Sequence, residues 1–265
     1  MSNVISDDGT RLAVRERGNA AGPTVVCVHG FPDSSALWDG VVRELAADFR
    51  VITFDMRGAG ESDRPKATQA YRLERLAEDL RAVGVKEDVH IIAHDWGSVA
   101  VWHALGNGLR AASFTSISGP DLGRAREWMR THRMHRQSVK SGYLLFFQIP
   151  FAAELVSRIG LLRLAVDLID PSHRGQPVSH QDVKHGLKLY RANVFARHQA
   201  AAGAISTPVQ VIAPARDRFV GAEMQTIAEG LLHEVDEGHW VPLTNPRFVA
   251  ERARDFITGI MSCAT

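Results

Sequence analysis

The sequence predicts an α/β protein whose mostly parallel sheet is covered by helices on both faces and interrupted by an inserted helical cap. Short apolar runs alternate with amphipathic segments up to about residue 120, which is typical of parallel sheets. The alternation stops over residues 121–206 and then resumes up to a closing helix. We therefore expect a core formed by residues 1–120 and 207–265 and a cap formed by residues 121–206.

Composition limits the classes of protein that this chain can belong to. The 265 residues include 45% apolar and 23% charged side chains, and the formal net charge is +1. This balance gives no indication of a nucleic-acid partner. The two cysteines, Cys27 and Cys263, provide no disulfide framework, so we expect a reducing, cytoplasmic compartment. We expect neither a signal peptide nor a membrane span, because no segment has the required apolar length.

The individual strands and helices are predicted from apolar periodicity. Residues 12–17 alternate apolar and charged side chains, which is typical of an edge strand. Residues 24–28 form a continuous β-branched run, which predicts a central strand. Further strands are predicted over residues 51–54, 89–93, 113–117, 208–213 and 231–235. Amphipathic helices are predicted over residues 34–47, 73–83 and 245–257.

The stretch from Val89 to Ala100 organises the rest of the chain. A buried strand is followed by a sharp turn into a helix, and Asp95 stands at the tip of this turn. The small residues Ala93 and Gly97 lie two positions on either side of Asp95. A tight strand-to-helix turn presents its central side chain outward, as the nucleophile elbow does for serine. Asp95 is therefore a candidate nucleophile, and the simpler alternative is a carboxylate that caps the helix.

Two further candidates follow the last two predicted strands. Asp217 and His239 come after strands that we expect to be parallel to the one before Asp95, so all three side chains should meet at one edge of the sheet. An imidazole at His239 could act as a base, with Asp217 holding its orientation. Asp121 is the rival for the acid position, since it also follows a predicted strand. The simpler alternatives are a solvated acid and a structural histidine.

Five motifs resemble those of the α/β-hydrolase family and, within it, the epoxide hydrolases. They are HGFP at 29–32, DMRGAGESD at 55–63, AHDWG at 93–97, ARDRFV at 215–220 and EGHW at 237–240. They extend along the whole chain in the family's order and are specific together. The chain also resembles the hydrolase half of bacterial proteins that fuse this domain to a short-chain reductase, although a free-standing enzyme fits equally well. The resemblance implies an α/β-hydrolase fold with an Asp95–His239–Asp217 triad.

The resemblance also implies the groups that surround the triad. Backbone N–H groups of Phe31 and Trp96 would form the oxyanion hole, and the Phe31–Pro32 bond would be cis. Tyr143 and Tyr190 match the family's two tyrosine motifs, and their phenols would hold and protonate an epoxide oxygen. The expected substrate pocket consists of Phe31, Trp96, Phe147 and Trp240.

These features together predict a cofactor-free, metal-free epoxide hydrolase. A carboxylate suits displacement at a saturated carbon, which would leave an ester on Asp95 that water then cleaves to release a diol. The enzymatic alternative is a haloalkane dehalogenase, in which the indoles of Trp96 and Trp128 would hold the halide. The non-enzymatic alternative is a small-molecule receptor on the same scaffold. The sequence does not indicate the oligomeric state or the stereochemistry of the substrate.

Two segments of the predicted cap bear on the substrate and on partners. Residues 144–166 are strongly apolar, and charges at Arg158, Arg163 and Asp167 favour an amphipathic helix over a membrane span. They predict an apolar pocket for an apolar epoxide, with a lipid-derived epoxide as one option. Residues 124–140 are rich in Arg and His, which favours a solvated helix; a weak contact with a membrane surface is the alternative.

Overall fold

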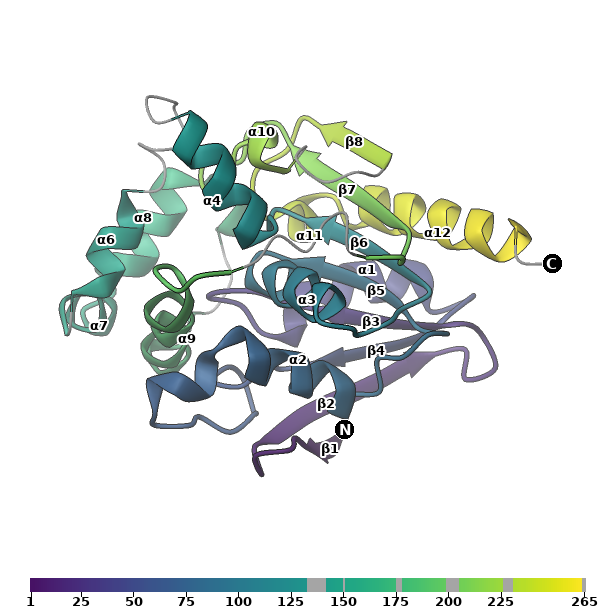
Figure 1. Cartoon of the computed structure of the whole chain (residues 1–265), viewed down its shortest axis with the longest axis horizontal. Helices are drawn as coiled ribbons and strands as arrows, with labels where there is room; N and C mark the ends of the chain where they lie inside the picture. The colour runs from purple at the N-terminus through teal and green to yellow at the C-terminus, as the bar shows by residue number, and fades with distance from the viewer. Residues whose placement is uncertain (133–141, 150, 175–177, 199–204, 226–230, 264–265) are drawn as a thin grey trace.

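The computed structural model describes residues 1–132, 142–149, 151–174, 178–198, 205–225 and 231–263. Eight strands form one sheet in the order β1-β2-β4-β3-β5-β6-β7-β8 (Figure 1). The strands are β1 Ser2–Ile5, β2 Arg11–Gly18, β3 Thr24–Val28, β4 Arg50–Phe54, β5 His90–His94, β6 Ser113–Ile117, β7 Val209–Pro214 and β8 Leu231–Val235. The pairs β1–β2 and β2–β4 are antiparallel, and every other neighbouring pair is parallel. The predicted, mostly parallel sheet is therefore confirmed.

Helices cover both faces of this sheet. On one face lie α2 (Leu73–Ala82) and α3 (Trp96–Gly106), and on the other lie α1 (Asp39–Leu45), α11 (Val241–Thr244) and α12 (Pro246–Cys263). Short helices are η1 Ser35–Trp38, η2 Thr68–Tyr71, η3 Pro171–His173 and α10 Ala222–Gln225. Strand β3 shows why two cores form: Val26 and Val28 face one cluster, and Val25 and Cys27 face the other. Alternate residues of a strand point to opposite faces, so this β-branched run is buried on both.

The prediction for residues 12–17 was wrong in one respect. They lie in β2, which pairs with β1 on one side and β4 on the other, so β2 is not an edge strand. The edge strand on this side of the sheet is β1, a four-residue strand with largely exposed side chains. A strand so short and so exposed has no apolar alternation by which it could be recognised.

The helices between β6 and β7 form a group that we call the helical insertion. It consists of α4 (Leu122–Thr131), α6 (Tyr143–Gln148), α7 (Ala152–Arg158), α8 (Leu161–Ile169) and α9 (His180–Asn193). It occupies the range predicted for the cap and lies at one end of the sheet, beside the carboxyl ends of the central strands (Figure 1). Of the basic stretch 124–140, residues 133–140 fall outside the described residues. Within the described parts of the chain, no helix is long and apolar enough to cross a membrane.

A buried ion pair anchors the glycine-rich turn after β4. The guanidinium of Arg57 is fully buried and donates two hydrogen bonds of 2.6 Å to the carboxylate of Asp79 on α2. It also donates to Asp8 at 2.8 Å and to the carbonyl of Ala70 at 2.7 Å. Removing one partner of such a buried pair strongly destabilises the fold, because the remaining charge stays buried without compensation.

We expect Asp79→Ala to lower the free energy of unfolding by about 3–5 kcal/mol, because it leaves the Arg57 charge poorly compensated. The matched control is Glu251→Ala, which breaks the exposed Arg247–Glu251 pair and should leave the free energy of unfolding almost unchanged, because solvent screens such pairs. Urea unfolding of the two variants gives the comparison. Equal losses in both would show that the buried pair has no special role.

Candidate active site

Asp95 lies at the turn between β5 and α3 in a backbone conformation that few residues other than glycine adopt. Its φ is +50° and its ψ is −123°, outside the regions that L-residues favour. The neighbouring glycines make the turn possible. A Cβ at Gly97 would lie 2.4 Å from the carbonyl oxygen of His29, and one at Gly30 would lie 2.4 Å from Asp95 Oδ1. The geometry is that of a strained elbow which presents a carboxylate.

The two oxygens of the Asp95 carboxylate have different neighbours. Oδ1 accepts a hydrogen bond of 2.8 Å from the backbone N–H of Phe31, in the loop whose Phe31–Pro32 bond is cis as expected. The backbone N–H of Trp96 also hydrogen-bonds to this carboxylate. Oδ2 lies 3.7 Å from Nε2 of His239. Oδ1 is therefore held by the backbone N–H of Phe31, while Oδ2 faces the imidazole.

His239 and Asp217 complete the arrangement. Nδ1 of His239 lies 2.9 Å from Oδ2 of Asp217, and both residues are buried. Oδ1 of Asp217 accepts the backbone N–H groups of Phe219 at 2.8 Å and Val220 at 2.9 Å. Asp121, the rival acid, caps α4 by accepting the N–H of Gly123. The structure thus brings together Asp95, His239 and Asp217.

The charges of these three groups depend on one another. Burial raises the pKa of Asp95 to about 6, although the nearby imidazolium and backbone donors oppose the increase. Burial alone would lower the pKa of His239, but the charges of Asp217 and Asp95 outweigh it and raise that pKa to about 9. Burial would raise the pKa of Asp217, but His239 keeps it below the usual value. At neutral pH the site holds two carboxylates around one imidazolium.

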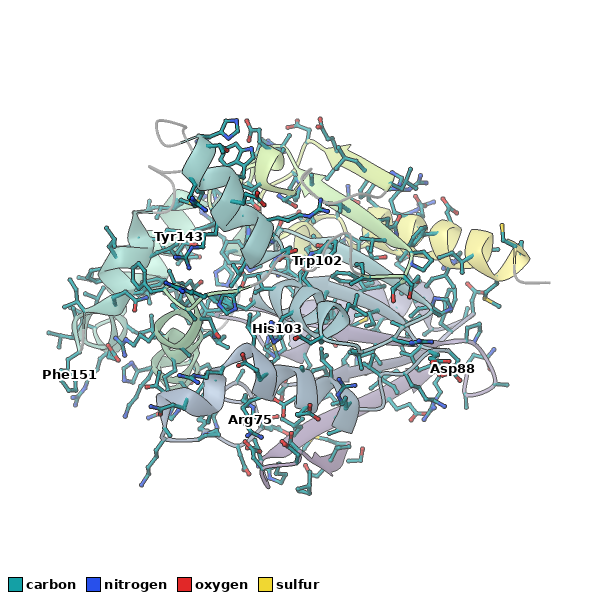
Figure 2. The ribbon with its side chains drawn as sticks, viewed as in Figure 1. Arg75, Asp88, Trp102, His103, Tyr143 and Phe151 are labelled. Atoms are coloured by element: carbon teal, nitrogen blue, oxygen red, sulfur yellow. The ribbon has the colours of Figure 1, made fainter. Side chains whose placement is uncertain are left out.

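Two phenols from the helical insertion face the same site. Tyr143 lies on α6 and Tyr190 on α9, with ring centroids 6.2 Å apart; Figure 2 labels Tyr143. Burial, followed by the charge of Asp95 among other neighbours, raises the pKa of both phenols well above the usual value. Both therefore remain protonated and able to donate a proton at neutral pH.

Asp95, His239 and both tyrosines line one cavity of about 300 Å³ between the sheet and the helical insertion. Its other walls are mainly apolar: Phe31, Pro32, Phe146, Phe147, Val156, Leu162, Ala165, Val166, Ile169, Phe219 and Trp240. Of the four residues expected in the pocket, Phe31, Phe147 and Trp240 line it. Trp96 does not, because its ring is buried edge-on against Tyr190, with centroids 4.9 Å apart.

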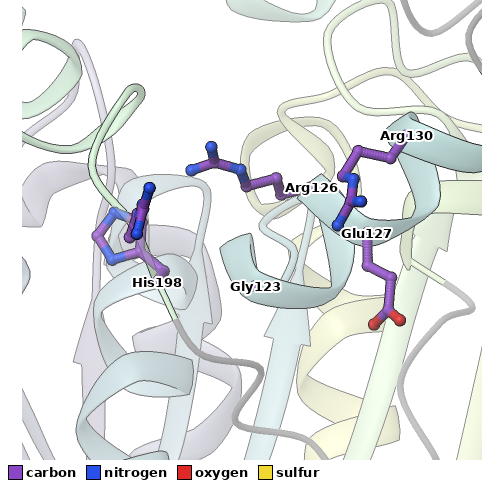
Figure 3. A pocket seen from close by; sticks show the side chains of 6 residues that line it. Gly123, Arg126, Glu127, Arg130 and His198 are labelled. Carbon is purple, nitrogen blue, oxygen red and sulfur yellow. The ribbon is translucent and has the colours of Figure 1, made fainter.

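Another cavity has a different character. It has a volume of about 370 Å³ and is lined by the polar and charged side chains of α4 and the segment after α9 (Figure 3). Arg126 there donates to the carbonyl of Ala196 at 3.0 Å. Trp128, also on α4, stacks on His132 with centroids 4.5 Å apart, and it lines neither cavity. Among the described residues, no cluster of His, Cys, Asp and Glu could hold a metal ion.

The sequence analysis missed the groups that hold the His239 loop. Oδ2 of Asp170 accepts the backbone N–H of His239 at 2.8 Å, and its Oδ1 accepts the N–H of Ser172 at 3.0 Å. Oγ of Ser172 in turn accepts the N–H of Trp240 at 3.2 Å. A Cβ at Gly238 would lie 2.5 Å from Asp170 Oδ1, so this approach requires glycine. The end of α8 therefore fixes the backbone of the imidazole loop.

A buried histidine makes a second connection of this kind. Nδ1 of His173 lies 3.2 Å from Asp167 on α8, and its Nε2 lies 3.7 Å from Asp33, just after the cis proline. Asp33 also accepts the indole N–H of Trp240 at 2.9 Å. Burial opposes protonation of His173, but the two carboxylates outweigh it and raise its pKa. In the sequence, Asp170-Pro171 indicates only the cap of a short helix. It does not indicate the contact of Asp170 with the His239 loop or the contacts of His173 with the two carboxylates.

A known family model and several known proteins match most of this chain. Residues 23–246 match the model of the alpha/beta hydrolase fold family. A protein of Mycobacterium tuberculosis named probable oxidoreductase EphD is 37% identical over 97% of this chain, and the match spans 49% of that protein. The chain thus spans about half the length of this relative. Epoxide hydrolase A of Mycobacterium tuberculosis is 30% identical, over 97% of both proteins.

Solved structures of epoxide hydrolases have the same fold as this chain. The epoxide hydrolase of Bacillus megaterium, in complex with a naphthyloxy-propanediol product, superposes with a TM-score of 0.79 over 97% of this chain and all of that one, at 21% identity. Epoxide hydrolase A of Mycobacterium thermoresistibile gives a TM-score of 0.74 at 26% identity, over 97% and 98% of the two chains. By fold, family model and sequence identity, this chain belongs to the epoxide hydrolase family within the α/β-hydrolases.

Proposed function

We propose that this chain hydrolyses an apolar epoxide to a vicinal diol through a covalent ester on Asp95. The observation that supports this most is the shared cavity, in which a carboxylate, an imidazole and two phenols face one mainly apolar space. An apolar wall suits an apolar substrate, and a few converging polar groups suit one reactive centre. The names of the relatives point to the same substrate class.

In the first step Oδ2 of Asp95 attacks an epoxide carbon and forms a carbon–oxygen bond. The ring bond from that carbon to the epoxide oxygen breaks, and its electron pair remains on the oxygen. Tyr143 and Tyr190 hold this oxygen, and one phenol transfers its proton to it. The product of the step is a hydroxyalkyl ester of Asp95 and a phenolate.

In the second step the neighbouring imidazole becomes a base. The imidazolium of His239 returns a proton to the phenolate, and esterification has removed the Asp95 charge that helps to raise the His239 pKa. Neutral His239 then takes a proton from water, which attacks the ester carbonyl of Asp95. Negative charge develops on the oxygen held by the N–H groups of Phe31 and Trp96. The tetrahedral intermediate then collapses, the bond from the Asp95 carbonyl carbon to the substrate oxygen breaks, and the His239 imidazolium protonates that oxygen, which releases the diol. The Asp95 carboxyl group returns its proton to His239, which restores the starting ion pair.

The two alternative functions have less support. A dehalogenase needs indole donors in the cavity, but the indole of Trp240 donates to Asp33 and Trp128 lies outside the cavity. The indole of Trp96 is also buried, behind Tyr190. A receptor has no need of a nucleophile, a base and an acid that line the same cavity. Measuring diol from an epoxide against halide from a chloroalkane distinguishes the three functions.

We expect His239→Gln to accumulate the ester, because the variant forms it but lacks the base that cleaves it. Mass spectrometry after incubation with a small epoxide should find the substrate mass on the peptide that contains Asp95. The control is Asp95→Asn, in which this adduct should not form. In wild-type enzyme, one turnover in heavy-oxygen water should place the isotope in the Asp95 carboxyl group; an isotope found only in the diol would contradict the ester.

We expect Tyr143→Phe combined with Tyr190→Phe to reduce epoxide opening by about 10²–10⁴-fold, since no phenol is left to protonate the leaving oxygen. Each single variant should retain more activity than the pair. The matched control is Phe146→Leu, a change to an apolar wall that carries no proton. Near-wild-type epoxide opening by the double variant would contradict the assignment of these two phenols as the proton donors.

We expect the rate of ester formation to fall as the pH drops below about 6, because Asp95 must be ionised to attack and its pKa is raised to about 6. Single-turnover kinetics across acidic pH measures this. In His239→Gln the fall should begin at a higher pH, because the imidazolium charge that lowers the Asp95 pKa is missing. A rate that stays level far below pH 6 in both proteins would exclude Asp95 as the titrating nucleophile.

A further inference from the structure

Exposed apolar side chains concentrate on one part of the molecule. Of the fifteen large apolar side chains that are exposed in the described residues, nine lie between residues 145 and 169. They are Leu145, Ile149, Phe151, Leu155, Ile159, Leu161, Leu164, Leu168 and Ile169, and we call them the exposed apolar face. A concentration of this kind on a globular protein marks a surface that contacts something other than water.

The exposed apolar face is formed by neighbouring helices. Helix α7 packs against both α6 and α8, and the three lie together at the end of the molecule opposite the carboxyl terminus (Figure 1). Phe151 stands at the outer extremity of this group (Figure 2), where 81% of its surface is exposed. Its φ of +64° is unfavourable for a bulky residue. The ring of Phe151 is therefore exposed to water from a backbone conformation that is itself unfavourable.

Helix α8 is apolar on two sides, and each side has a different surrounding. Leu162 and Val166, four residues apart, line the Asp95 cavity. Leu161, Leu164 and Leu168, at spacings of three and four residues, face outward and are exposed. An amphipathic helix of a globular protein normally buries its apolar side chains, so three exposed leucines on α8 are unusual. One wall of the active-site cavity is therefore also the outer surface of the molecule.

The exposed charged side chains in the same stretch of the chain have one sign. Among the described residues of 143–174, the exposed charged side chains are Arg158, Arg163 and Arg174. Two acidic side chains of this stretch are partly buried and paired. Glu154 pairs with Arg191, and Asp167 contacts Arg163 and His173. Arg158 has no acidic partner among the described residues. Arg163 is thus already paired, which leaves Arg158 and Arg174 as the exposed charges. A second copy of this chain would bring like charges together, whereas anionic lipid headgroups would neutralise them.

We infer that the exposed apolar face docks on the surface of an anionic lipid bilayer. Phe151 and the outward leucines of α7 and α8 would enter the headgroup–acyl boundary, and the arginines would contact lipid phosphates. Docking would place the thin α8 wall of the cavity against the lipid. If the proposed function holds, an apolar epoxide dissolved in the bilayer could then reach Asp95 without crossing water; the docking itself does not depend on that function.

Co-sedimentation of the whole chain with lipid vesicles tests this inference. The protein should partition to vesicles of phosphatidylcholine and phosphatidylglycerol more strongly than to phosphatidylcholine alone, and salt should weaken the binding. The triple variant Phe151→Ser, Leu155→Ser, Leu168→Ser should bind at least about tenfold more weakly, since the buried apolar area is lost. Arg158→Ser should lose part of the preference for anionic vesicles. None of these four residues lines the cavity.

Controls separate docking from folding and from catalysis. Leu231→Ser, at an exposed leucine on β8, should bind like the wild type. The surface variants should keep the wild-type unfolding midpoint. Asp95→Asn should bind vesicles normally, so failure of the proposed function leaves this result intact. Absence of binding to anionic vesicles, or equal binding by the triple variant, would overturn the inference. So would a dimer in solution that the triple variant abolishes, because a second copy would then cover the face.

Discussion

The balance of charge among Asp95, His239 and Asp217 is the constraint on which the rest of the structure depends. Three ionisable groups in a buried site are costly unless each is paired and hydrogen-bonded. Here the imidazole lies between two carboxylates, and backbone N–H groups satisfy the outer oxygens of both acids. The arrangement also makes the His239 pKa depend on the state of Asp95. Asp95 and His239 can thus form an ion pair before ester formation, and His239 can act as a neutral base afterwards.

The scaffold serves this balance by bringing distant parts of the chain to one edge of the sheet. Parallel strands β5, β7 and β8 end on the same side, so the turns that follow them deliver the three side chains together. Glycines at positions 30, 97 and 238 allow the loops to approach more closely than any side chain would permit. The helical insertion then supplies the phenols and the apolar walls, and it limits access of water to the charges.

Much of the core and of the triad could be predicted from the sequence, because local pattern determines both. Apolar periodicity located every parallel strand to within two residues, and motif order placed Asp95, Asp217 and His239 at strand ends. The short strand β1 was missed, since four exposed residues carry no pattern. Trp96 was expected in the pocket, but which side of a turn an indole occupies depends on packing against Tyr190. The Asp170–His239 contact joins residues 69 positions apart, and nothing local encodes it.

That last contact limits how freely the substrate-facing helices can diversify. Helix α8 shapes the cavity through Leu162 and Val166, while the residues just after it hold the backbone of the imidazole loop. The residues that shape the substrate cavity and those that align the catalytic loop therefore belong to one continuous segment of the chain. A graft that replaces α8 to accept a bulkier compound must keep residues 170–173 in register, or it will displace the loop on which turnover relies.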